Sequence, residues 1–354
     1  MSVIIEDFDI IEKAYEKELG KLQGKKILVT GSYGMITSYL CLFLIHIMDK
    51  FDLELYLQGR NERKLRERYG NFEDKRHVHL MTFDFEKGEI PDIKPDFILH
   101  AASAASTKYF IECPVDVLRP NTVGTWNLLN YAKENHVEKF LFFSSNSIYG
   151  EGGVNKAVLT ENDYGIVDPL NDRSCYIESK RMSEQMCAAF WKQYRVPSVI
   201  IRICHTYGPT FDVEQDTRII PRTIKKILCD SDIEIYRDPD SVIQYTYIAD
   251  MVAAILLIML KGNNGEAYNA GSDEIVKMDD VISWMLQADP QIKSKLIEKE
   301  IDGKYNFAKG KGINFLKLSN EKLRSLGWRQ LYSNEEGFKR TVRHYLAYGQ
   351  EITS

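Results

Sequence analysis

The stretch KKILVTGSYGMIT, residues 25–37, decides the fold of this chain. Its first half is a short apolar run with β-branched side chains, which is typical of a buried strand. Gly31-Ser32-Tyr33-Gly34 then forms a turn, and the apolar run that starts at Met35 indicates a buried helix. Glycines let a backbone approach a phosphate closely, and a helix N-terminus supplies free amides and partial positive charge. The stretch therefore predicts a dinucleotide-binding turn, the alternative being a tight turn without a ligand.

The choice of cofactor depends on the ends of the next two predicted strands, at 53–59 and 77–85. An acidic residue after the first of them would bind a ribose 2′-hydroxyl, but the chain has Gly59-Arg60-Asn61. Arg60 suits a 2′-phosphate or the face of adenine, so NADP(H) is favoured; if Arg60 is only a solvated charge, NAD(H) binds instead. Asp84 suits adenine or a turn cap. We expect cofactor contacts from Gly31, Tyr33, Gly34, Met35, Ile36, Arg60, Asn61, Asp84 and Phe85.

Strands and helices alternate from residue 25 to residue 203, which predicts an α/β fold with a Rossmann-type, doubly wound parallel sheet. After Gly208-Pro209 the pattern becomes α+β and predicts a smaller C-terminal substrate lobe. The expected parts are a helical extension at 1–23, an NAD(P)-binding domain at 24–208 and a mainly substrate-binding lobe at 209–354, from which the chain can return to the first domain. Further strands are predicted at 25–31, 96–102, 139–145 and 198–203, and helices at 34–49, 61–69, 118–135 and 176–194.

Composition narrows the class of protein. The chain has 354 residues, a net charge of −5 and scattered Lys and Arg, which does not suggest nucleic acid. Its six cysteines form no C-x-x-C pair and have no ligand-like spacing with histidine, so we expect reduced thiols and no metal site. The N-terminus lacks the pattern of a signal peptide, and the longest apolar stretch, Met35 to Met48, is too short to span a bilayer. We expect a cytoplasmic protein without membrane insertion.

Tyr176 and Lys180 are the candidates for catalysis, together with Ser145 at the end of a strand-like run. A spacing of four residues places the phenol and the amine on one face of a helix. We expect the ammonium to favour the phenolate and to lower the pKa of Tyr176 toward neutrality. Such a tyrosine exchanges a proton with a hydroxyl or carbonyl while a nicotinamide carries the hydride. The alternative is that Tyr176 only packs and Ser145 only ends a strand.

The chain resembles the extended short-chain dehydrogenase/reductase family, in its nucleotide-sugar epimerase/dehydratase/reductase group, over roughly residues 24–347. This resemblance implies a nucleotide-activated sugar or polyol precursor as substrate, and a homodimer formed through the helices at 118–135 and 176–194. The motifs that carry it include TGSYG (30–34), HAAS (100–103), NTVGTWNLL (121–129), FSSNSIYG (143–150), YIESK (176–180), RICHTYGP (202–209), YTYIADM (245–251) and GEAYNAGS (265–272).

The resemblance also implies roles for individual residues. Ser145 would hydrogen-bond the reacting oxygen, Tyr176 would be the acid or base, and Lys180 would hold the nicotinamide ribose. Ala101, Ala102 and Ser103 would line the cofactor, and Asn121, also expected among the cofactor-binding residues, would steady the central sheet and a water. His205 stands where the family often has an asparagine that touches the substrate diphosphate, although a lone histidine is more often a core residue. Expected substrate contacts are Asn146, Ser147, His205, Arg218 and Arg222, the arginines being surface charges in the alternative interpretation.

Two departures from the family pattern narrow the chemistry. Dehydratases and decarboxylases carry an acidic residue just after the catalytic serine or threonine, where this chain has Asn146 and Ser147. Because water loss needs a general acid, dehydration and decarboxylation are disfavoured. Ile243 replaces an arginine that pairs with the β-phosphate. We expect an NADPH-dependent reductase of a keto sugar or ketose; the alternatives are an NAD-dependent epimerase and a silent NADP-binding sensor.

Overall fold

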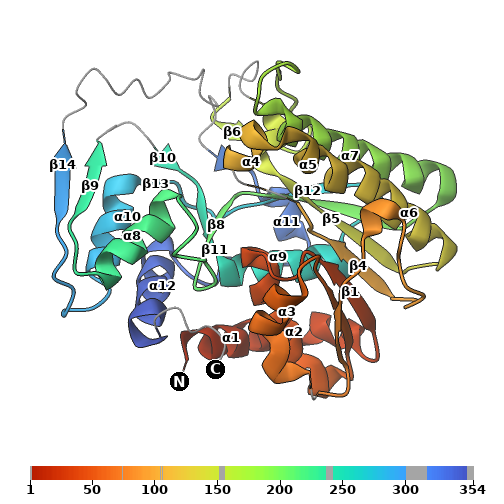
Figure 1. Ribbon diagram of the computed structural model, residues 1–354, viewed down its shortest axis with the longest axis horizontal. Helices are drawn as coiled ribbons and strands as arrows, with labels where there is room; N and C mark the ends of the chain where they lie inside the picture. Colours follow the sequence, from red (N-terminus) through yellow and green to blue (C-terminus); the bar gives the residue numbers. More distant parts are fainter. Residues whose placement is uncertain are drawn as a thin grey trace.

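A central sheet with helices on both sides forms the middle of the molecule (Figure 1). The computed structural model describes residues 2–73, 75–103, 105, 107–150, 156–236, 242–299 and 317–348. These residues form one sheet of seven parallel strands in the order β12-β7-β5-β4-β1-β2-β3, which confirms the predicted Rossmann-type α/β fold. The strands are β1 (Lys26–Thr30), β2 (Glu54–Gln58), β3 (Val78–Met81), β4 (Phe97–His100), β5 (Lys139–Ser145), β7 (Ser198–Ile203) and β12 (Ala267–Ala270).

The strand order reverses at β1, because β2 and β3 follow on one side while β4, β5 and β7 follow on the other. In open parallel sheets, ligands bind outside the carboxyl ends of the strands at such a switch point. The turn that begins at Gly31 follows β1 and therefore lies at this point. Short 3₁₀ turns also lie between the helices and strands: η1 (Gly20–Leu22), η2 (Gly70–Phe72), η3 (Phe85–Lys87) and η5 (Asn146–Tyr149).

Helices cover both faces of the sheet (Figure 1). On one face α5, α6 and α7 contact one another, and a π-helical turn, η4 (Pro120–Gly124), joins α5 to α6. On the other face α9 packs against β5, β7 and β12 and against α1 and α2. The first group is α4 (Thr107–Glu112), α5 (Pro114–Arg119), α6 (Thr125–Glu134) and α7 (Ser174–Tyr194); the second is α1 (Val3–Leu19), α2 (Met35–Phe51), α3 (Glu62–Tyr69) and α9 (Ile248–Lys261).

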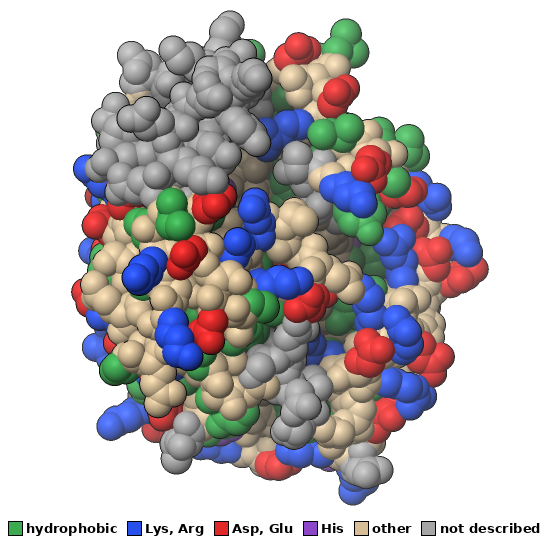
Figure 2. Space-filling model, turned by 60° about the vertical axis from the view of Figure 1, so that its left-hand side comes forward, with side chains coloured by type: hydrophobic (Ala, Val, Ile, Leu, Met, Phe, Trp, Pro, Cys, Tyr) green, Lys and Arg blue, Asp and Glu red, His purple; other side chains and the backbone are tan. Residues whose placement is uncertain are grey.

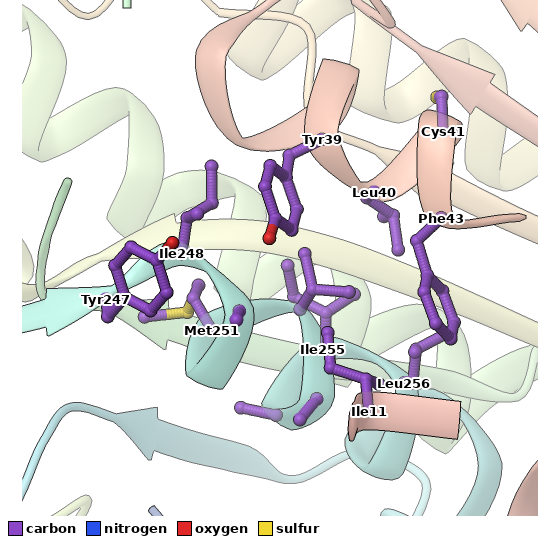
Figure 3. Packing of buried hydrophobic residues seen from close by; sticks show 14 of the residues in the cluster. Ile11, Tyr39, Leu40, Cys41, Phe43, Tyr247, Ile248, Met251, Ile255 and Leu256 are labelled. Carbon is purple, nitrogen blue, oxygen red and sulfur yellow. The ribbon is translucent and has the colours of Figure 1, made fainter. Parts of the chain in front are cut away.

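The core below the sheet draws on three distant segments of the chain (Figure 3). Phe43 from α2, Ile255 from α9 and Ile11 from α1 are fully buried within it. Helix α9 is apolar all round, which is typical of a helix enclosed by protein. Burial of each such side chain stabilises the fold by about 1.5–3 kcal/mol. The sheet therefore rests on a helix that comes after residue 209.

The remaining C-terminal elements form the smaller α+β lobe (Figure 1). Strand β12 leaves it to pair with β7, so the chain returns to the sheet after the lobe has begun. The boundary at residue 208 stays a prediction. The elements are β8 (His205–Tyr207), α8 (Ile219–Leu228), β9 (Ile233–Tyr236), β10 (Val242–Ile243), β11 (Tyr245–Tyr247), β13 (Val276–Lys277), α10 (Met278–Leu286), β14 (Leu296–Lys299) and α12 (Asn334–Tyr348). Helix α11 (Glu321–Ser325) instead contacts β12 of the sheet, and β15 (Lys317–Leu318) pairs with β6 (Val158–Leu159).

A buried carboxylate fastens α1 to both parts of the molecule. Asp7 accepts hydrogen bonds from the Tyr39 hydroxyl of α2 at 2.7 Å and from the Tyr247 hydroxyl of β11 at 2.6 Å. Its other oxygen accepts from Arg340 Nε of α12 at 2.9 Å. Burial raises the pKa of Asp7, and the charge of Arg340 opposes that effect. Four elements that are remote in sequence thus meet at one side chain.

The surface carries mixed charge. On the face in Figure 2, Lys and Arg alternate with Asp and Glu rather than gathering into a patch of one sign. None of the helices formed by the described residues has the length and apolar character needed to cross a membrane.

Candidate active site

Gly31 is required by the geometry of the turn after β1. Its φ angle is +66°, in the left-handed region that favours glycine. A Cβ atom at this position would lie 2.7 Å from Ala102 Cα, so the segment after β4 passes directly over the turn. Thr37, which stands where a third glycine is usual, donates from Oγ1 to the Gly31 carbonyl at 2.6 Å. The threonine ties the turn to the first turn of α2.

Two hydroxyl groups at this edge are buried without a partner among the described residues. They are Ser32 Oγ in the turn after β1 and Ser103 Oγ after β4. Buried polar atoms in folded proteins are nearly always hydrogen-bonded, so such a pair indicates a place for a polar ligand. Together with the close approach at Gly31, these hydroxyls fit the dinucleotide expected from the sequence.

Gln58, which the sequence did not single out, supports the turn from β2. Its Oε1 accepts from the Gly31 backbone N–H at 3.2 Å, and its Nε2 donates to the Phe83 carbonyl at 2.8 Å. The side chain is fully buried. The sequence feature that could have identified Gln58 is its position, because it is a polar residue at the last position of a mostly apolar strand.

The structure brings Ser145, Tyr176 and Lys180 together above the end of β5. Ser145 Oγ accepts from the Ser147 backbone N–H at 3.1 Å and lies within hydrogen-bonding distance of the Tyr176 hydroxyl. The Tyr176 ring stacks on Phe110, with centroids 4.8 Å apart and planes at 20°. Lys180 is buried one turn further along α7. The three groups predicted for catalysis therefore share one location.

The pKa expected for Tyr176 is wrong in this structure. Burial raises the pKa of the phenol, and the hydrogen bond with Ser145 opposes that rise. Burial also lowers the pKa of Lys180 to about 7. The Lys180 ammonium donates to the Phe143 carbonyl at 2.7 Å and lies over the Phe142 ring at 4.7 Å from its centroid, compared with 5.8 Å for the Tyr176 ring. The amine is directed at β5, which explains why its charge does not dominate the tyrosine.

A buried ion pair that the sequence analysis missed holds β5, β7 and α7 together. Glu184, one turn after Lys180, accepts from Arg202 Nη2 at 2.8 Å and from Ser144 Oγ at 2.5 Å. Arg202 also donates to the Tyr149 hydroxyl at 2.9 Å. Every charge in this network has several partners, as a buried pair requires. The network lies directly behind Ser145 and fixes the strand that carries it.

Asn121 lies in η4 and reaches α7 rather than the sheet. Its Nδ2 donates to Ser179 Oγ at 3.0 Å and to the Val117 carbonyl at 3.1 Å. Its Oδ1 is buried without a partner among the described residues. Ser179 precedes Lys180, so Asn121 positions the helical turn that carries the amine.

Several residues that were predicted to contact the adenine part of the cofactor stabilise local structure. Asn61 caps α3, where its Oδ1 accepts from the Lys64 backbone N–H at 3.1 Å. Asp84 caps η3 by accepting from the Glu86 backbone N–H at 3.0 Å, as the cap interpretation expected. Phe85 is buried, and a Cβ at Gly124 would lie 2.5 Å from its ring. Their contact with a cofactor stays a prediction.

The predicted substrate residues lie in two places: Asn146 and Ser147 in η5 after β5, and His205 with the two arginines in the part of the chain after β7. His205 is exposed at the start of β8, so the core interpretation of this histidine is wrong. Desolvation within the cleft and the charge of Arg218 lower the pKa of its imidazole. Arg218 binds Asp216, with Nε 3.0 Å from a carboxylate oxygen, and Arg222 is exposed one turn later on α8.

A polar cavity connects this lobe to the turn after β1. Its volume is about 420 Å³, and its wall includes Tyr33, Met35, Arg68 and Arg218. Thr210 Oγ1 donates to the Met35 carbonyl at 2.8 Å and so closes one side. Within the described part of the chain, no three His, Cys, Asp or Glu side chains are arranged to hold a metal ion.

Comparisons with known proteins find matches over most of the chain. The model of the NAD dependent epimerase/dehydratase family matches residues 27–271. The chain is 26% identical over 335 residues to dTDP-D-glucose 4,6-dehydratase of Homo sapiens, with 91% of this chain and 90% of the relative covered. It is 28% identical over 335 residues to UDP-glucuronic acid decarboxylase 1 of Xenopus tropicalis, with 93% and 74% covered.

Solved structures share the fold at low identity. The dTDP-glucose 4,6-dehydratase of Bacillus anthracis, in complex with NAD, has a TM-score of 0.74 at 20% identity, with 93% of this chain and 98% of that one covered. The UDP-glucose 4-epimerase of Thermotoga maritima, with UDP-glucose, has a TM-score of 0.74 at 22% identity, with 91% and 99% covered.

Proposed function

The chain belongs to the NAD dependent epimerase/dehydratase family, and from this premise we propose that it is an NADPH-dependent reductase of a nucleotide-activated keto sugar or ketose. The observation that carries the proposal is the meeting of Ser145, Tyr176 and Lys180 at the edge of the sheet where the Gly31 turn lies. A proton donor, a hydrogen-bonding hydroxyl and an amine are the groups that carbonyl reduction needs.

Tyr176 is the acid in this proposal. When bound, a reduced nicotinamide supplies the hydride to the carbonyl carbon. The Tyr176 hydroxyl gives its proton to the carbonyl oxygen, and Ser145 Oγ hydrogen-bonds the same oxygen and orients it. Because burial raises the pKa of Tyr176, the phenol stays protonated at neutral pH and suits the direction of reduction.

Dehydration and decarboxylation fit this chain less well, although the curated relatives include enzymes of both kinds. Asn146 and Ser147 stand where those reactions need an acidic side chain. Asn146 is buried, and Ser147 Oγ accepts from Ser145 Oγ at 3.1 Å. An amide and a hydroxyl cannot protonate a leaving hydroxyl group efficiently.

Epimerisation is the second candidate, favoured by the fold shared with UDP-glucose 4-epimerase of Thermotoga maritima. An epimerase retains NAD and returns the hydride to the other face of the sugar. Incubation with candidate activated sugars separates the two. Stoichiometric oxidation of added NADPH supports the reductase, whereas interconversion of sugars without added cofactor contradicts it and supports the epimerase.

NADP(H) is the proposed cofactor because no carboxylate occupies residues 59–61 after β2. Arg60 is mostly exposed there and carries free donors for a 2′-phosphate. NAD(H) is the alternative, and NAD is the cofactor in the related Bacillus anthracis structure.

His205, Arg218 and Arg222 are proposed to hold the diphosphate of the substrate. They come from the start of β8 and the start of α8, and Arg218 also lines the polar cavity beside the turn after β1. Ile243 occupies the position at which the family often has a phosphate-binding arginine, and its side chain packs against the core. The phosphate contacts are therefore assigned to His205, Arg218 and Arg222 in this proposal.

A homodimer is also proposed, through α5, α6 and α7. These helices contact one another and expose large apolar side chains. Such a surface is typical of a protein interface. Light scattering of the wild type and of Trp126→Glu tests it: a dimer that becomes a monomer supports the interface, and a monomeric wild type contradicts it. The exposed side chains are Val115, Val123, Trp126, Met182 and Tyr194.

The cytoplasm is the proposed location, because all six cysteines are free thiols and three of them, Cys41, Cys187 and Cys204, are buried. Reduced cysteines are usual in a reducing compartment.

A further inference from the structure

Glu86 lies between two arginines at the edge of the sheet where β2 and β3 end. Its Oε1 is 3.4 Å from Arg60 Nη1, and its Oε2 is 3.3 Å from Arg119 Nε. The Glu86 side chain is only 5% exposed, whereas Arg60 is 61% exposed and Arg119 is 50% exposed. A buried carboxylate thus holds two guanidinium groups that face solvent.

The position of Glu86 is fixed by its backbone. Asn127 Nδ2 of α6 donates to the carbonyls of both Phe85 and Glu86, at 2.9 and 3.1 Å. Asp84 accepts from the Glu86 N–H, and the Phe85 ring packs against Gly124. The backbone of Glu86 is therefore held in place and its side chain is enclosed, whereas the more exposed Arg60 side chain has room to turn toward a ligand.

The charges of this cluster decide what it can bind. Two guanidinium groups against one carboxylate leave a net charge of +1, and the neighbouring Lys87 is paired with Asp84 at 3.6 Å. Both Glu86 oxygens already face a cation, so this carboxylate is a poor acceptor for a ribose diol. The free N–H groups of Arg60 instead suit an anion.

We propose that Glu86 competes with the 2′-phosphate of the cofactor for Arg60, and that Arg119 weakens this competition. The inference rests on the proposed binding of a nicotinamide dinucleotide at this edge. When Arg60 turns to the phosphate, Glu86 keeps one cationic partner in Arg119 and is not left as an unpaired buried charge. Arg119 is thus a positioning residue that sets the preference between a phosphorylated and an unphosphorylated ribose.

Calorimetric titration with 2′,5′-ADP and 5′-AMP tests the inference, because these probes differ only in the 2′-phosphate. The loss of charge-assisted hydrogen bonds in Arg60→Leu should raise the Kd for 2′,5′-ADP by about 10- to 100-fold and leave the Kd for 5′-AMP within about 3-fold. Removal of the competing charge in Glu86→Gln lowers the Kd for 2′,5′-ADP by about 3- to 10-fold. Glu138→Gln is the control, since that glutamate pairs with Lys25 at the amino ends of the strands, opposite to the ends near Glu86.

The double variant isolates the part played by Arg119. Arg119→Leu raises the Kd for 2′,5′-ADP by about 5-fold when Glu86 is present, and changes it by less than about 2-fold in the Glu86→Gln background. An equal effect in both backgrounds means that Arg119 contacts the phosphate directly and overturns the inference. An unchanged ratio of the two Kd values in Glu86→Gln overturns it as well.

Two further measurements separate a loss of affinity from a loss of structure. Thermal unfolding of each variant shows whether a lost affinity reflects lost structure, and Arg119→Lys, which retains the charge, should behave like wild type. If wild-type protein binds neither NADPH nor NADH, the proposed function fails together with the inference. If it binds either of them and the variants do not change the preference, only the inference fails.

Discussion

Asp7 and Arg340 lie 333 residues apart in the chain and form an ion pair, 2.8 Å long, in the interior. The pair joins the first helix to the last, and the hydroxyls of Tyr39 and Tyr247 complete the partners of the carboxylate. Because its members come from α1, α2, β11 and α12, this cluster connects the sheet to the smaller lobe.

Replacement of Asp7 tests how much this connection contributes to stability. Asp7→Ala leaves two buried hydroxyls without their acceptor and removes the buried carboxylate partner of Arg340, which keeps Glu6 and the Val3 carbonyl as hydrogen-bond partners. We expect the free energy of unfolding to fall by about 3–5 kcal/mol. Denaturant titration measures the change. Asp9→Asn, on the exposed side of the same helix, is the control and should change stability by less than about 0.5 kcal/mol. A loss below about 1 kcal/mol in Asp7→Ala would contradict the role given to the pair.

Tyr176→Phe tests the proposed acid. Removal of the hydroxyl should lower kcat by about 10²- to 10⁴-fold while nucleotide binding is retained. Steady-state kinetics and calorimetry supply the two measurements. Tyr194→Phe, an exposed tyrosine at the end of the same helix, is the matched control. Unchanged turnover in Tyr176→Phe would show that another group carries the proton.

Glu184→Gln tests the network behind Ser145. The variant removes the negative charge that faces Arg202 in the interior and should destabilise the fold by about 3–5 kcal/mol. We also expect kcat to fall more than affinity for the nucleotide, because β5 carries Ser145 but not the Gly31 turn. Glu178→Gln, on the same helix and more exposed, is the control. Equal effects of the two substitutions would exclude a special role for Glu184.

The buried carboxyl of Asp250 should make the free energy of unfolding depend on pH. Burial raises the pKa of this carboxyl to about 8. Between the usual value of 3.8 and this value the folded state holds one proton more than the unfolded state, so stability falls as pH rises through the window. The limiting slope is about 1.4 kcal/mol per pH unit.

Asp250→Asn should remove that dependence, because the amide cannot ionise. The difference in unfolding free energy between variant and wild type should shift in favour of the variant from pH 5 to pH 8. Denaturant titrations at several pH values measure it. A difference that does not change with pH would mean that Asp250 is ionised throughout.

Gly31→Ala tests the turn after β1. Alanine there meets both a positive φ and a Cβ position 2.7 Å from Ala102, so nucleotide binding should be lost and stability should fall by about 1–3 kcal/mol. Gly20→Ala is the control, since Gly20 has helical φ and ψ and open space for a methyl group. Its expected effect is a gain of about 0.5–1 kcal/mol. Normal binding in Gly31→Ala would place the nucleotide elsewhere.

Local pattern was sufficient for much of the fold. The strand and turn at 25–37 and the i, i+4 spacing of Tyr176 and Lys180 depend only on near neighbours, and both form as expected. The third strand was predicted at 77–85, but β3 ends at Met81. Beyond it, Gln58 takes the Phe83 carbonyl and Asp84 caps a turn, and these side-chain bonds leave no trace in hydrophobic periodicity.

The parts of the site that depend on contacts between distant segments could not be predicted from the sequence. Glu86 with Arg119, and Glu184 with Arg202, are ordinary charged residues until the fold pairs them. The pKa of Tyr176 was expected to fall because Lys180 is close in sequence, but burial and the direction of the amine are properties of the packed protein.

Helix α9 has a consequence for the way this molecule is assembled in time. A polypeptide that has left the ribosome only as far as residue 208 has the turn after β1 and the helices α1 to α3, yet the face of β5 and β7 that α9 covers is still open. That cover arrives with residues 248–261, and the partner of Asp7 arrives later still, at Arg340. The nucleotide-binding half therefore has its packing completed by segments that are synthesised late, and without them apolar surface and the carboxylate of Asp7 would be exposed to water.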